Sequence, residues 1–396
     1  MKAKPNAAGS MPRTLYYLLA AQFLSVFADN TLMFTVVAIV MRQAQTPSWY
    51  IPALQSVFLV SFVALAPWLG GIADRRPKAR VLIAANAVKA LGGGLLFAGG
   101  VEPLAAYSVV GLGAALYSPA KYGILPELAG HGRLIAANSW IEGSTILAIL
   151  AGTGLGAKIA DYSIPYALGA AISLFLCSAL ISLALPRTAP LKPPAAANPL
   201  RRFLRDVLEF LRHPRCRFAV LGGSLFWGSA ACIRVILLAW APLVLGAQNV
   251  SDISELILFL AIGIILGSAA TPWLIPLNHL RRARYPALLM GLFIIALGLS
   301  AQLWPARAIL LALGAVGGLF IVPINASLQD IGYHSIGGGS AVAMQNFFQN
   351  AAMLTAVGAY TAAASLQVGP AQALLGLGAL ELIGVMLLMR GFERRV

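Results

Sequence analysis

The stretch LYYLLAAQFLSVFADNTLMFTVVAIVM, residues 15–41, is 27 residues long and contains one charged residue, Asp29. An apolar run of 18 or more residues is long enough to cross the hydrocarbon core of a bilayer as a helix. Comparable runs recur along the chain of 396 residues, which is 59% hydrophobic and only 10% charged. Soluble domains carry roughly a quarter charged residues. The composition therefore predicts an all-α polytopic membrane protein.

Charged residues, glycines and prolines separate the apolar runs and divide the chain into twelve predicted transmembrane helices. Their expected spans are 15–41, 51–73, 79–99, 103–124, 136–158, 163–185, 218–246, 253–277, 284–302, 306–327, 339–362 and 369–390. The helices form two groups of six, so we expect an N-terminal six-helix bundle (1–185), a cytoplasmic linker (186–217) and a C-terminal six-helix bundle (218–396). The glycine pairs Gly152/Gly156 and Gly263/Gly267 have the spacing that brings membrane helices close together.

The linker has two parts. It begins with PRTAPLKPPAAANP, a flexible-linker composition. The following LRRFLRDVLEFLRH predicts an amphipathic helix with Leu and Phe on one face and Arg on the other. Such a helix suits the surface of the cytoplasmic leaflet, although a charged connector without specific lipid contact is an equal alternative.

The net charge of +15 reflects topology rather than nucleic-acid binding. Basic residues cluster in every second loop, at 74–80, 187–217, 281–284 and 390–396. Loops that stay in the cytoplasm carry such an excess of Lys and Arg. The pattern predicts an even number of spans with both termini in the cytoplasm.

The two halves of the sequence are related to each other. PWLGGIADRRPKARVL, which starts at Pro67, aligns without a gap with PWLIPLNHLRRARYPAL, which starts at Pro272. Two further blocks match between the halves: YSPAKYG (117–123) with IVPINAS (321–327) pairs Lys121 with Asn325, and NSWIEGS (138–144) with NFFQNAA (346–352) pairs Glu142 with Asn350. Internally repeated halves are a transporter architecture in which the substrate site lies near the midplane between them.

Six blocks of the sequence are distinctive: AQFLSVFADNTLMF, ALYSPAKYGILPEL, AANSWIEGSTILA, GSLFWGSAACIRVILLAW, FIVPINASLQDIG and AVAMQNFFQNAAML. A seventh, GGIADRRPKAR, is similar to the loop motif of the major facilitator superfamily, with Pro77 where Gly is common. The six blocks together resemble the bacterial lysophospholipid transporter family of that superfamily. The resemblance covers nearly the whole chain and implies the major facilitator fold, two pseudo-symmetric six-helix bundles.

The resemblance also implies a function and a location. A member of this family is a flippase of the bacterial inner membrane that moves lysophospholipids, chiefly lysophosphatidylethanolamine, from the outer to the inner leaflet by alternating access. A cytoplasmic acyltransferase/acyl-ACP synthetase would then re-acylate the lipid, and this trapping would drive downhill flow without a coupled ion. The family implies no cofactor and no metal.

Charged side chains within the predicted helices are the candidate site residues. Each costs about 2.5–3.5 kcal/mol in hydrocarbon, so such residues usually face a cavity and find partners. Asp29 and Arg234 lie about 21 and 24 Å from the cytoplasmic ends of their helices, which predicts an ion pair across the central passage. Lys121 and Glu142 lie nearer the cytoplasm and form a second, weaker predicted pair. We expect each pair to act as a latch that a charged headgroup opens.

Two charged residues within the helices, Lys89 and Glu381, are better interpreted as structural, because their helices are expected at the periphery. Each predicted ion pair also has a purely structural interpretation, in which it only stabilises the folded protein by giving a buried charge a partner.

Polar amides accompany these charges and complete the predicted substrate site. They are Asn30, Asn138, Gln345, Asn346, Gln349 and Asn350, the last four beside Phe347 and Phe348. Amides next to aromatic rings suit an amphiphile, although amide hydrogen bonds between helices are also ordinary packing devices. The loop residues Asp74, Arg75, Lys78 and Arg80 resemble a cytoplasmic clamp that stabilises an outward-open state.

Two other classes of protein are alternatives for this sequence. The sequence has no Gly-Lys-Ser/Thr phosphate loop, no Cys/His metal spacing and no His followed five residues later by Asp, which argues against an enzyme or an ATP-driven pump. A proton-coupled multidrug efflux transporter of the same superfamily is the closer alternative, because Asp29 could titrate. A pocket for cationic drugs has little use for Arg234, which disfavours that alternative.

Overall fold

A computed structural model describes residues 12–42, 50–186, 198–246 and 250–393, and these residues are almost entirely helical. The first half of the chain contains α1 (Arg13–Met41), α2 (Tyr50–Arg75), α3 (Lys78–Ala98), α4 (Pro103–Gly123), α5 (Leu125–Ala129), η1 (His131–Arg133), α6 (Leu134–Tyr162) and α7 (Ile164–Ser182). The second contains α8 (Pro199–Arg212), α9 (Pro214–Leu245), α10 (Val250–Leu274), η2 (Leu277–Ala283), α11 (Arg284–Leu299), α12 (Leu303–His334), α13 (Gly338–Ser365) and α14 (Pro370–Glu393).

The chain is a polytopic helical membrane protein, as the composition predicts. Within the described residues, ten helices are long and apolar enough to cross a bilayer. The two other long helices, α4 and α13, carry polar side chains such as Lys121 and Gln345, and both lie where the two groups of helices meet. Most helix boundaries agree with the predicted spans to within four residues. The exception is α12, which continues to His334, seven residues past its predicted end.

The ends of the helices follow from local chemistry. Glu102 caps α4 by accepting a hydrogen bond from the backbone N–H of Ala105 at 2.9 Å, and Pro103 occupies the first turn, where its missing N–H is harmless. Asn198 caps α8 in the same way, and α9 ends at Gly246, whose φ of +67° favours glycine.

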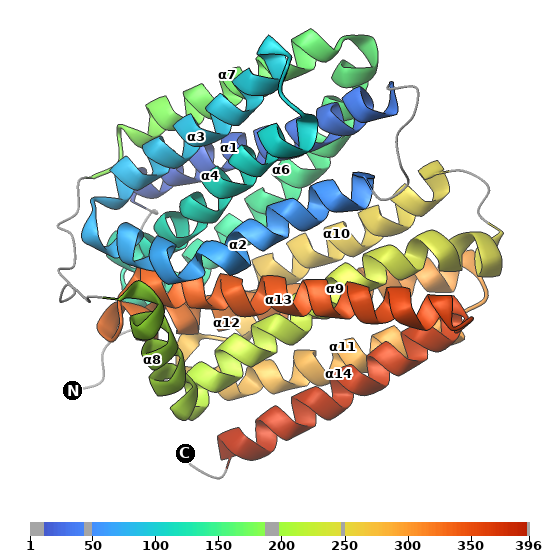
Figure 1. Cartoon of the computed structure of the whole chain (residues 1–396). Coiled ribbons are helices and arrows are strands. Elements are labelled where there is room, and N and C mark those ends of the chain that lie inside the picture. The colour runs from blue at the N-terminus through green and yellow to red at the C-terminus, as the bar shows by residue number, and fades with distance from the viewer. Residues whose placement is uncertain (1–11, 43–49, 187–197, 247–249, 394–396) are drawn as a thin grey trace, which may run out of the picture.

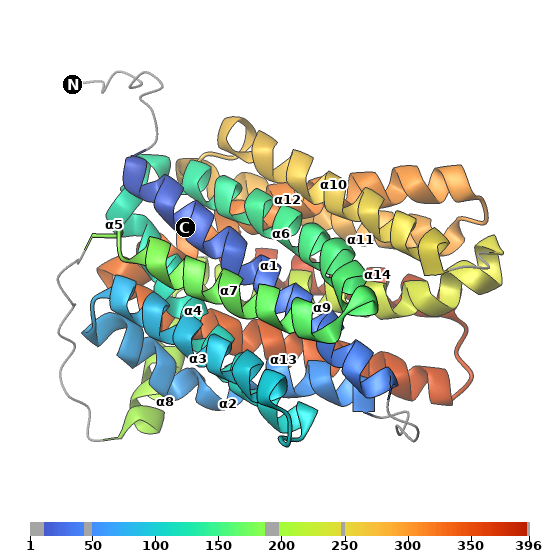
Figure 2. The ribbon, with the colours of Figure 1, turned by 90° about the horizontal axis from the view of Figure 1, so that it is seen from above.

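Two groups of helices lie side by side along the length of the molecule (Figure 1). We name α1–α7 the N-terminal half and α9–α14 the C-terminal half. They meet where α2 packs against α13 and α6 packs against α10 and α12 (Figure 2). Within each half, glycines allow close packing. A Cβ on Gly152 would lie 2.6 Å from the carbonyl oxygen of Phe27 on α1, so the close approach predicted from the glycine spacing is confirmed.

One end of the molecule collects the basic residues, and we name it the basic end. It is the end at which α1 begins and α14 ends, and at which α8 lies across the bundle (Figure 1). Arg75 and Arg390 lie in the last turns of their helices at this end, and Arg281 lies in η2.

Candidate functional site

A polar cluster lies inside the N-terminal half, around Asp29 of α1. The Lys89 ammonium donates to Asp29 Oδ2 at 2.7 Å and to Ser25 Oγ at 3.0 Å. Ser25 donates to Asn86 at 2.8 Å, and Asn86 donates to Ser178 of α7 at 2.9 Å. We name these five residues the N-half cluster. They connect α1, α3 and α7 through an ion pair and a continuous chain of hydrogen bonds.

The predicted ion pair between Asp29 and Arg234 is wrong, because Asp29 pairs with Lys89 of its own half. The predicted depth of Arg234 assumed a helix that begins at residue 218, whereas α9 begins at Pro214. Counted from the observed helix starts, Asp29 lies about 24 Å and Arg234 about 30 Å along its helix. The two residues are therefore not at matching depth. Depth also gave no information on which neighbouring helix offers a partner.

Lys89 is buried, with 1% of its side chain exposed, contrary to its expected place at the periphery. Its ammonium lies 4.7 Å from the centre of the Tyr117 ring and 5.5 Å from that of Phe175. Cation–π contacts of this kind stabilise a buried ammonium in addition to its ion pair. Gly113 of α4 leaves room for the lysine, because a Cβ there would lie 2.6 Å from Lys89 Cγ.

Two groups near the middle of the helices lack a partner in the described part of the chain. The Oδ1 atom of Asp29 is buried and accepts no hydrogen bond from the described part of the chain. Arg234 has an exposed side chain, and the described residues offer it no carboxylate within 4.0 Å.

The second predicted ion pair, Lys121 with Glu142, is also not formed. Glu142 Oε1 instead accepts from the Tyr122 hydroxyl and from Asn325 Nδ2, each at 2.9 Å. The Lys121 ammonium lies over the Tyr122 ring, 4.1 Å from its centre. The tyrosine thus stands between the two charges, contacting Lys121 through its face and Glu142 through its hydroxyl. Asn325 belongs to the C-terminal half, so Glu142 joins the two halves.

The predicted amides occupy three different settings. Asn138 of α6 and Gln329 of α12 exchange two hydrogen bonds of 2.9 Å across the halves. Asn346 of α13 donates to Ser118 of α4, also across the halves, at 2.9 Å.

The remaining four amides stay within one half. Gln345 donates to Asn325 at 2.6 Å. Asn30 and Asn350 donate to backbone carbonyls of their own helices, at 2.9 and 2.7 Å. The Gln349 amide nitrogen is buried without an acceptor in the described part of the chain. Asn30 and Asn350 thus have local structural partners.

Asp74 forms a clamp between the halves at the basic end. Its carboxylate accepts from the backbone N–H groups of Gly339 and Ser340, at 2.7 and 2.8 Å, and from the Ser340 hydroxyl at 2.7 Å. These groups form the first turn of α13, where unpaired N–H groups and the helix dipole attract an anion. Gly337, with φ of +104°, precedes that turn, and a Cβ there would collide with Asp74.

The basic residues of the predicted clamp behave differently from Asp74. Lys78 pairs with Glu127 of α5, inside the N-terminal half. Arg75 and Arg80 are exposed and make no ion pair with any described residue. They therefore form no ion pair between the halves within the described residues.

The hydrogen bonds between the halves concentrate at the basic end. Those of Asp74, Asn138, Glu142 and Asn346 all lie within about 14 Å of the helix ends there. His131 and Asp330 add a contact of 2.8 Å between the halves at the surface. The basic end is therefore closed, and we name these contacts the basic-end gate.

Several gate residues were not among the predicted site residues. They are Ser118, His131, Asn325, Gln329, Asp330, Gly339 and Ser340. The alignment of the halves paired Lys121 with Asn325 and so could have directed attention to that asparagine. No group of three His, Cys, Asp or Glu side chains in the described ranges is placed to hold a metal ion.

Comparisons with known proteins identify the family. Residues 18–387 match the family model of the Major Facilitator Superfamily. The lysophospholipid transporter LplT of Klebsiella pneumoniae is 38% identical over 371 residues, 93% of each chain. That of Escherichia coli K12 is 37% identical over the same share.

Solved structures confirm the fold. The E. coli fucose:proton symporter FucP superposes with a TM-score of 0.73 at 14% identity, covering 95% of this chain and 97% of its own. The human organic anion transporter MFSD10 gives 0.73 at 15% identity, with 96% and 100% covered. The chain belongs to the bacterial lysophospholipid transporter family of the major facilitator superfamily.

Proposed function

We propose that this protein transports lysophospholipids across the bacterial inner membrane, from the outer to the inner leaflet, by alternating access between its two halves. The observation that carries the proposal is the 37–38% identity to lysophospholipid transporters over 93% of the chain. The closed basic-end gate supports it, because a transporter of this kind must close one end while the other admits substrate.

The basic end is proposed to face the cytoplasm. Arginine and lysine side chains concentrate in the loops at that end, which is the distribution that the positive-inside rule describes. Both termini are then cytoplasmic. With the basic end closed, the passage in this structure would admit lipid from the periplasmic side.

The headgroup chemistry assigns complementary roles to Asp29 and Arg234. A phosphodiester is an anion and suits the Arg234 guanidinium, which is accessible and has no carboxylate within 4.0 Å among the described residues. An ethanolamine ammonium is a cation and suits Asp29, whose Oδ1 atom is not engaged by the N-half cluster. Lysophosphatidylethanolamine carries both groups and is the proposed principal substrate.

The gate is proposed to open when substrate engages the passage. Glu142, Asn138, Asn346 and Asp74 contact neutral groups of the C-terminal half, so opening separates no buried ion pair. Lys121, held over the Tyr122 ring, is proposed to receive the phosphate as the lipid passes the gate. A cytoplasmic acyltransferase/acyl-ACP synthetase would then re-acylate the lipid and keep the flow downhill.

The experiment is uptake of radiolabelled lysophosphatidylethanolamine by spheroplasts that lack their native lysophospholipid transporter. Wild-type chain is expected to restore uptake, and Asp29→Asn and Arg234→Gln to reduce it at least tenfold. The matched control is Asp161→Asn, an exposed carboxylate at the opposite end of α6. The amount of folded protein in the membrane is measured for each variant.

The outcomes separate the candidate functions. No uptake by the wild-type chain, together with increased resistance of cells to cationic drugs, would establish the efflux alternative. Uptake by wild type that survives both Asp29→Asn and Arg234→Gln would leave the transport function standing and overturn the assignment of the headgroup to these two residues.

A further inference from the structure

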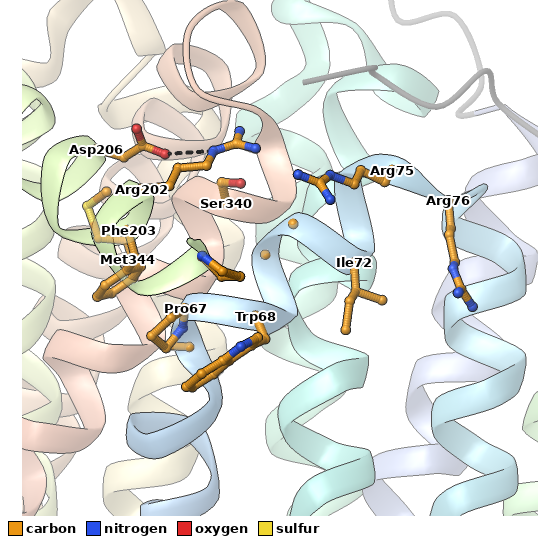
Figure 3. Close-up of a pocket in the computed structure, with 14 residues that line it drawn as sticks. Pro67, Trp68, Ile72, Arg75, Arg76, Arg202, Phe203, Asp206, Ser340 and Met344 are labelled. Carbon is orange, nitrogen blue, oxygen red and sulfur yellow. Dashed lines mark hydrogen bonds and ion pairs between the residues drawn. The ribbon is translucent and has the colours of Figure 1, made fainter. Parts of the chain in front are cut away.

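A pocket of about 260 Å³ lies beside the basic-end gate. It is bounded by α2 of the N-terminal half and by α8 and α13 on the other side (Figure 3). Pro67, Trp68, Phe203 and Met344 give it an apolar wall. Ser340, which donates to Asp74, is also part of the lining. The pocket therefore spans the junction of the two halves at the gate itself.

The pocket carries an excess of positive charge. Three arginines and one carboxylate line it, namely Arg75, Arg76, Arg202 and Asp206, which gives a net charge of +2. Arg202 uses its Nε to contact Asp206 at 3.3 Å, so its terminal nitrogens stay available. Arg75 makes no ion pair with any described residue.

The arrangement of two guanidinium groups indicates the class of ligand. Figure 3 shows Arg75 and Arg202 directed into the same space next to Ser340, one from each side of the pocket. Like charges that face one space without an anion between them repel each other. A phosphate can accept charge-assisted hydrogen bonds from both guanidinium groups and remove that repulsion.

The surroundings of the pocket indicate that the phosphate belongs to a lipid. Trp68 is 46% exposed beside the arginines, and tryptophan is enriched at membrane interfaces. Helix α8 buries Phe203 against Phe347, at 5.5 Å between ring centres, and exposes Leu200, Leu204 and Leu208. A short helix with exposed leucines on one face and arginines on the other suits the membrane surface. An acyl chain can therefore run along Trp68 while its headgroup meets the arginines.

We propose that this pocket binds the phosphate of an anionic phospholipid from the leaflet at the basic end, and that the bound lipid favours the closed gate. The lipid would contact Arg75 of the N-terminal half and Arg202 of α8 at the same time. Opening the gate moves the halves apart at this end and breaks one of the two contacts. The lipid is a resident ligand, separate from the transported substrate.

The first test measures binding. Native mass spectrometry of the full chain, released from detergent, is used to titrate phosphatidylglycerol against phosphatidylcholine. Wild type is expected to bind one phosphatidylglycerol at least about tenfold more tightly, and Arg75→Gln and Arg202→Gln to lose about fivefold each. The matched control is Arg201→Gln, an exposed neighbour on α8 that lies outside the pocket.

The second test measures the gate. Hydrogen exchange of the Gly339 and Ser340 amides, which donate to Asp74, is compared in nanodiscs of phosphatidylglycerol and phosphatidylcholine. Phosphatidylglycerol is expected to slow this exchange in wild type and in Arg201→Gln. The slowing is expected to disappear in Arg75→Gln.

Each other result overturns the proposal. Equal losses in Arg75→Gln, Arg202→Gln and Arg201→Gln would indicate diffuse attraction of α8 to an anionic surface. Inorganic phosphate that slows exchange in the absence of anionic lipid would make the site one for free phosphate. If Arg202→Gln displaces α8 by losing its contact with Asp206, Arg75→Gln decides the question, because Arg75 has no ion pair to lose in the described structure. None of these readouts depends on lysophospholipid transport.

Discussion

The polar contacts inside the N-terminal half differ in kind from those between the halves. Inside the half, two buried lysines meet carboxylates: Lys89 pairs with Asp29, and Lys78 pairs with Glu127. Between the halves, buried charges meet neutral groups, as Asp74 does at the start of α13 and Glu142 does at Asn325. The charged partner of the buried contacts comes from the N-terminal half in both cases.

The difference follows from what each region has to do. Breaking a buried ion pair is unfavourable by about 3–5 kcal/mol, because it leaves a charge without a partner. A hydrogen bond between a charged and a neutral group contributes about 1.5–3 kcal/mol. Halves that move as rigid bodies keep their internal ion pairs intact throughout the cycle. The gate between them has to open, and contacts of intermediate strength allow it.

The largest effect on the N-terminal half is expected from removing the lysine of the N-half cluster. Lys89→Met leaves the Asp29 carboxylate buried and unpaired, which is expected to lower the free energy of unfolding by about 3–5 kcal/mol. Thermal unfolding of the purified protein in detergent measures the change. The double variant Asp29→Asn, Lys89→Met is expected to recover most of the stability, since no buried charge remains.

Lys158→Met is the control for this experiment, because Lys158 is exposed and is expected to change stability by no more than about 0.5 kcal/mol. A Lys89→Met protein as stable as wild type would show that the ion pair does not hold the half together. The contrast between internal and inter-half contacts would then fail.

A smaller effect is expected at the gate, where Asp74→Asn removes the negative charge at the start of α13. The amide cannot reproduce both backbone contacts, so the population with an open basic end is expected to rise about 10- to 100-fold, equivalent to about 1.5–3 kcal/mol. Electron spin resonance distances between labels at Gly132 and Ser335, in a background without native cysteines, report that population. Unchanged distances combined with normal folding would remove Asp74 from the gate.

The amide pair of Asn138 and Gln329 tests the gate at a contact that contains no charge. Its two hydrogen bonds are expected to contribute about 1–2 kcal/mol of coupling to the closed gate. A double-mutant cycle with Asn138→Ala and Gln329→Ala, measured by the same label distances, isolates that coupling. Additive effects of the two substitutions would mean that the amides do not act as a pair.

The helices could be predicted from the sequence because apolar runs report membrane spans directly. The end of α12 could not, because the segment after Ser327 contains Gln329 and Asp330 and reads as a loop. In the structure Gln329 is 1% exposed and packs against Asn138 in the gate. A polar helix end that is buried by protein has the same composition as one that faces water.

The charged residues within the helices could be found from the sequence, but their pairing could not. Charged residues within membrane helices are visible in a sequence because they interrupt apolar runs, as Asp29, Glu142 and Arg234 do. Which charges meet depends on how the helices are arranged around each other, and helix depth does not contain that information. Asp29 was therefore predicted to pair with a residue of the opposite half, whereas in the structure the long Lys89 side chain contacts it from α3.

The smallest effect is expected for the contact at the surface of the gate, His131 with Asp330. The histidine side chain is 57% exposed, and exposed ion pairs contribute about 0–1 kcal/mol. His131→Asn is therefore expected to change the population with an open basic end by less than about fivefold, measured by the same label distances. At a pH where the histidine is protonated, 1 M salt shortens the Debye length to about 3 Å, and the difference from wild type should vanish. The effect of Asp74→Asn should survive the same salt, because the Asp74 carboxylate is fully buried. A salt-resistant effect at His131 that equals the effect at Asp74 would mean that burial does not determine the strength of the gate contacts.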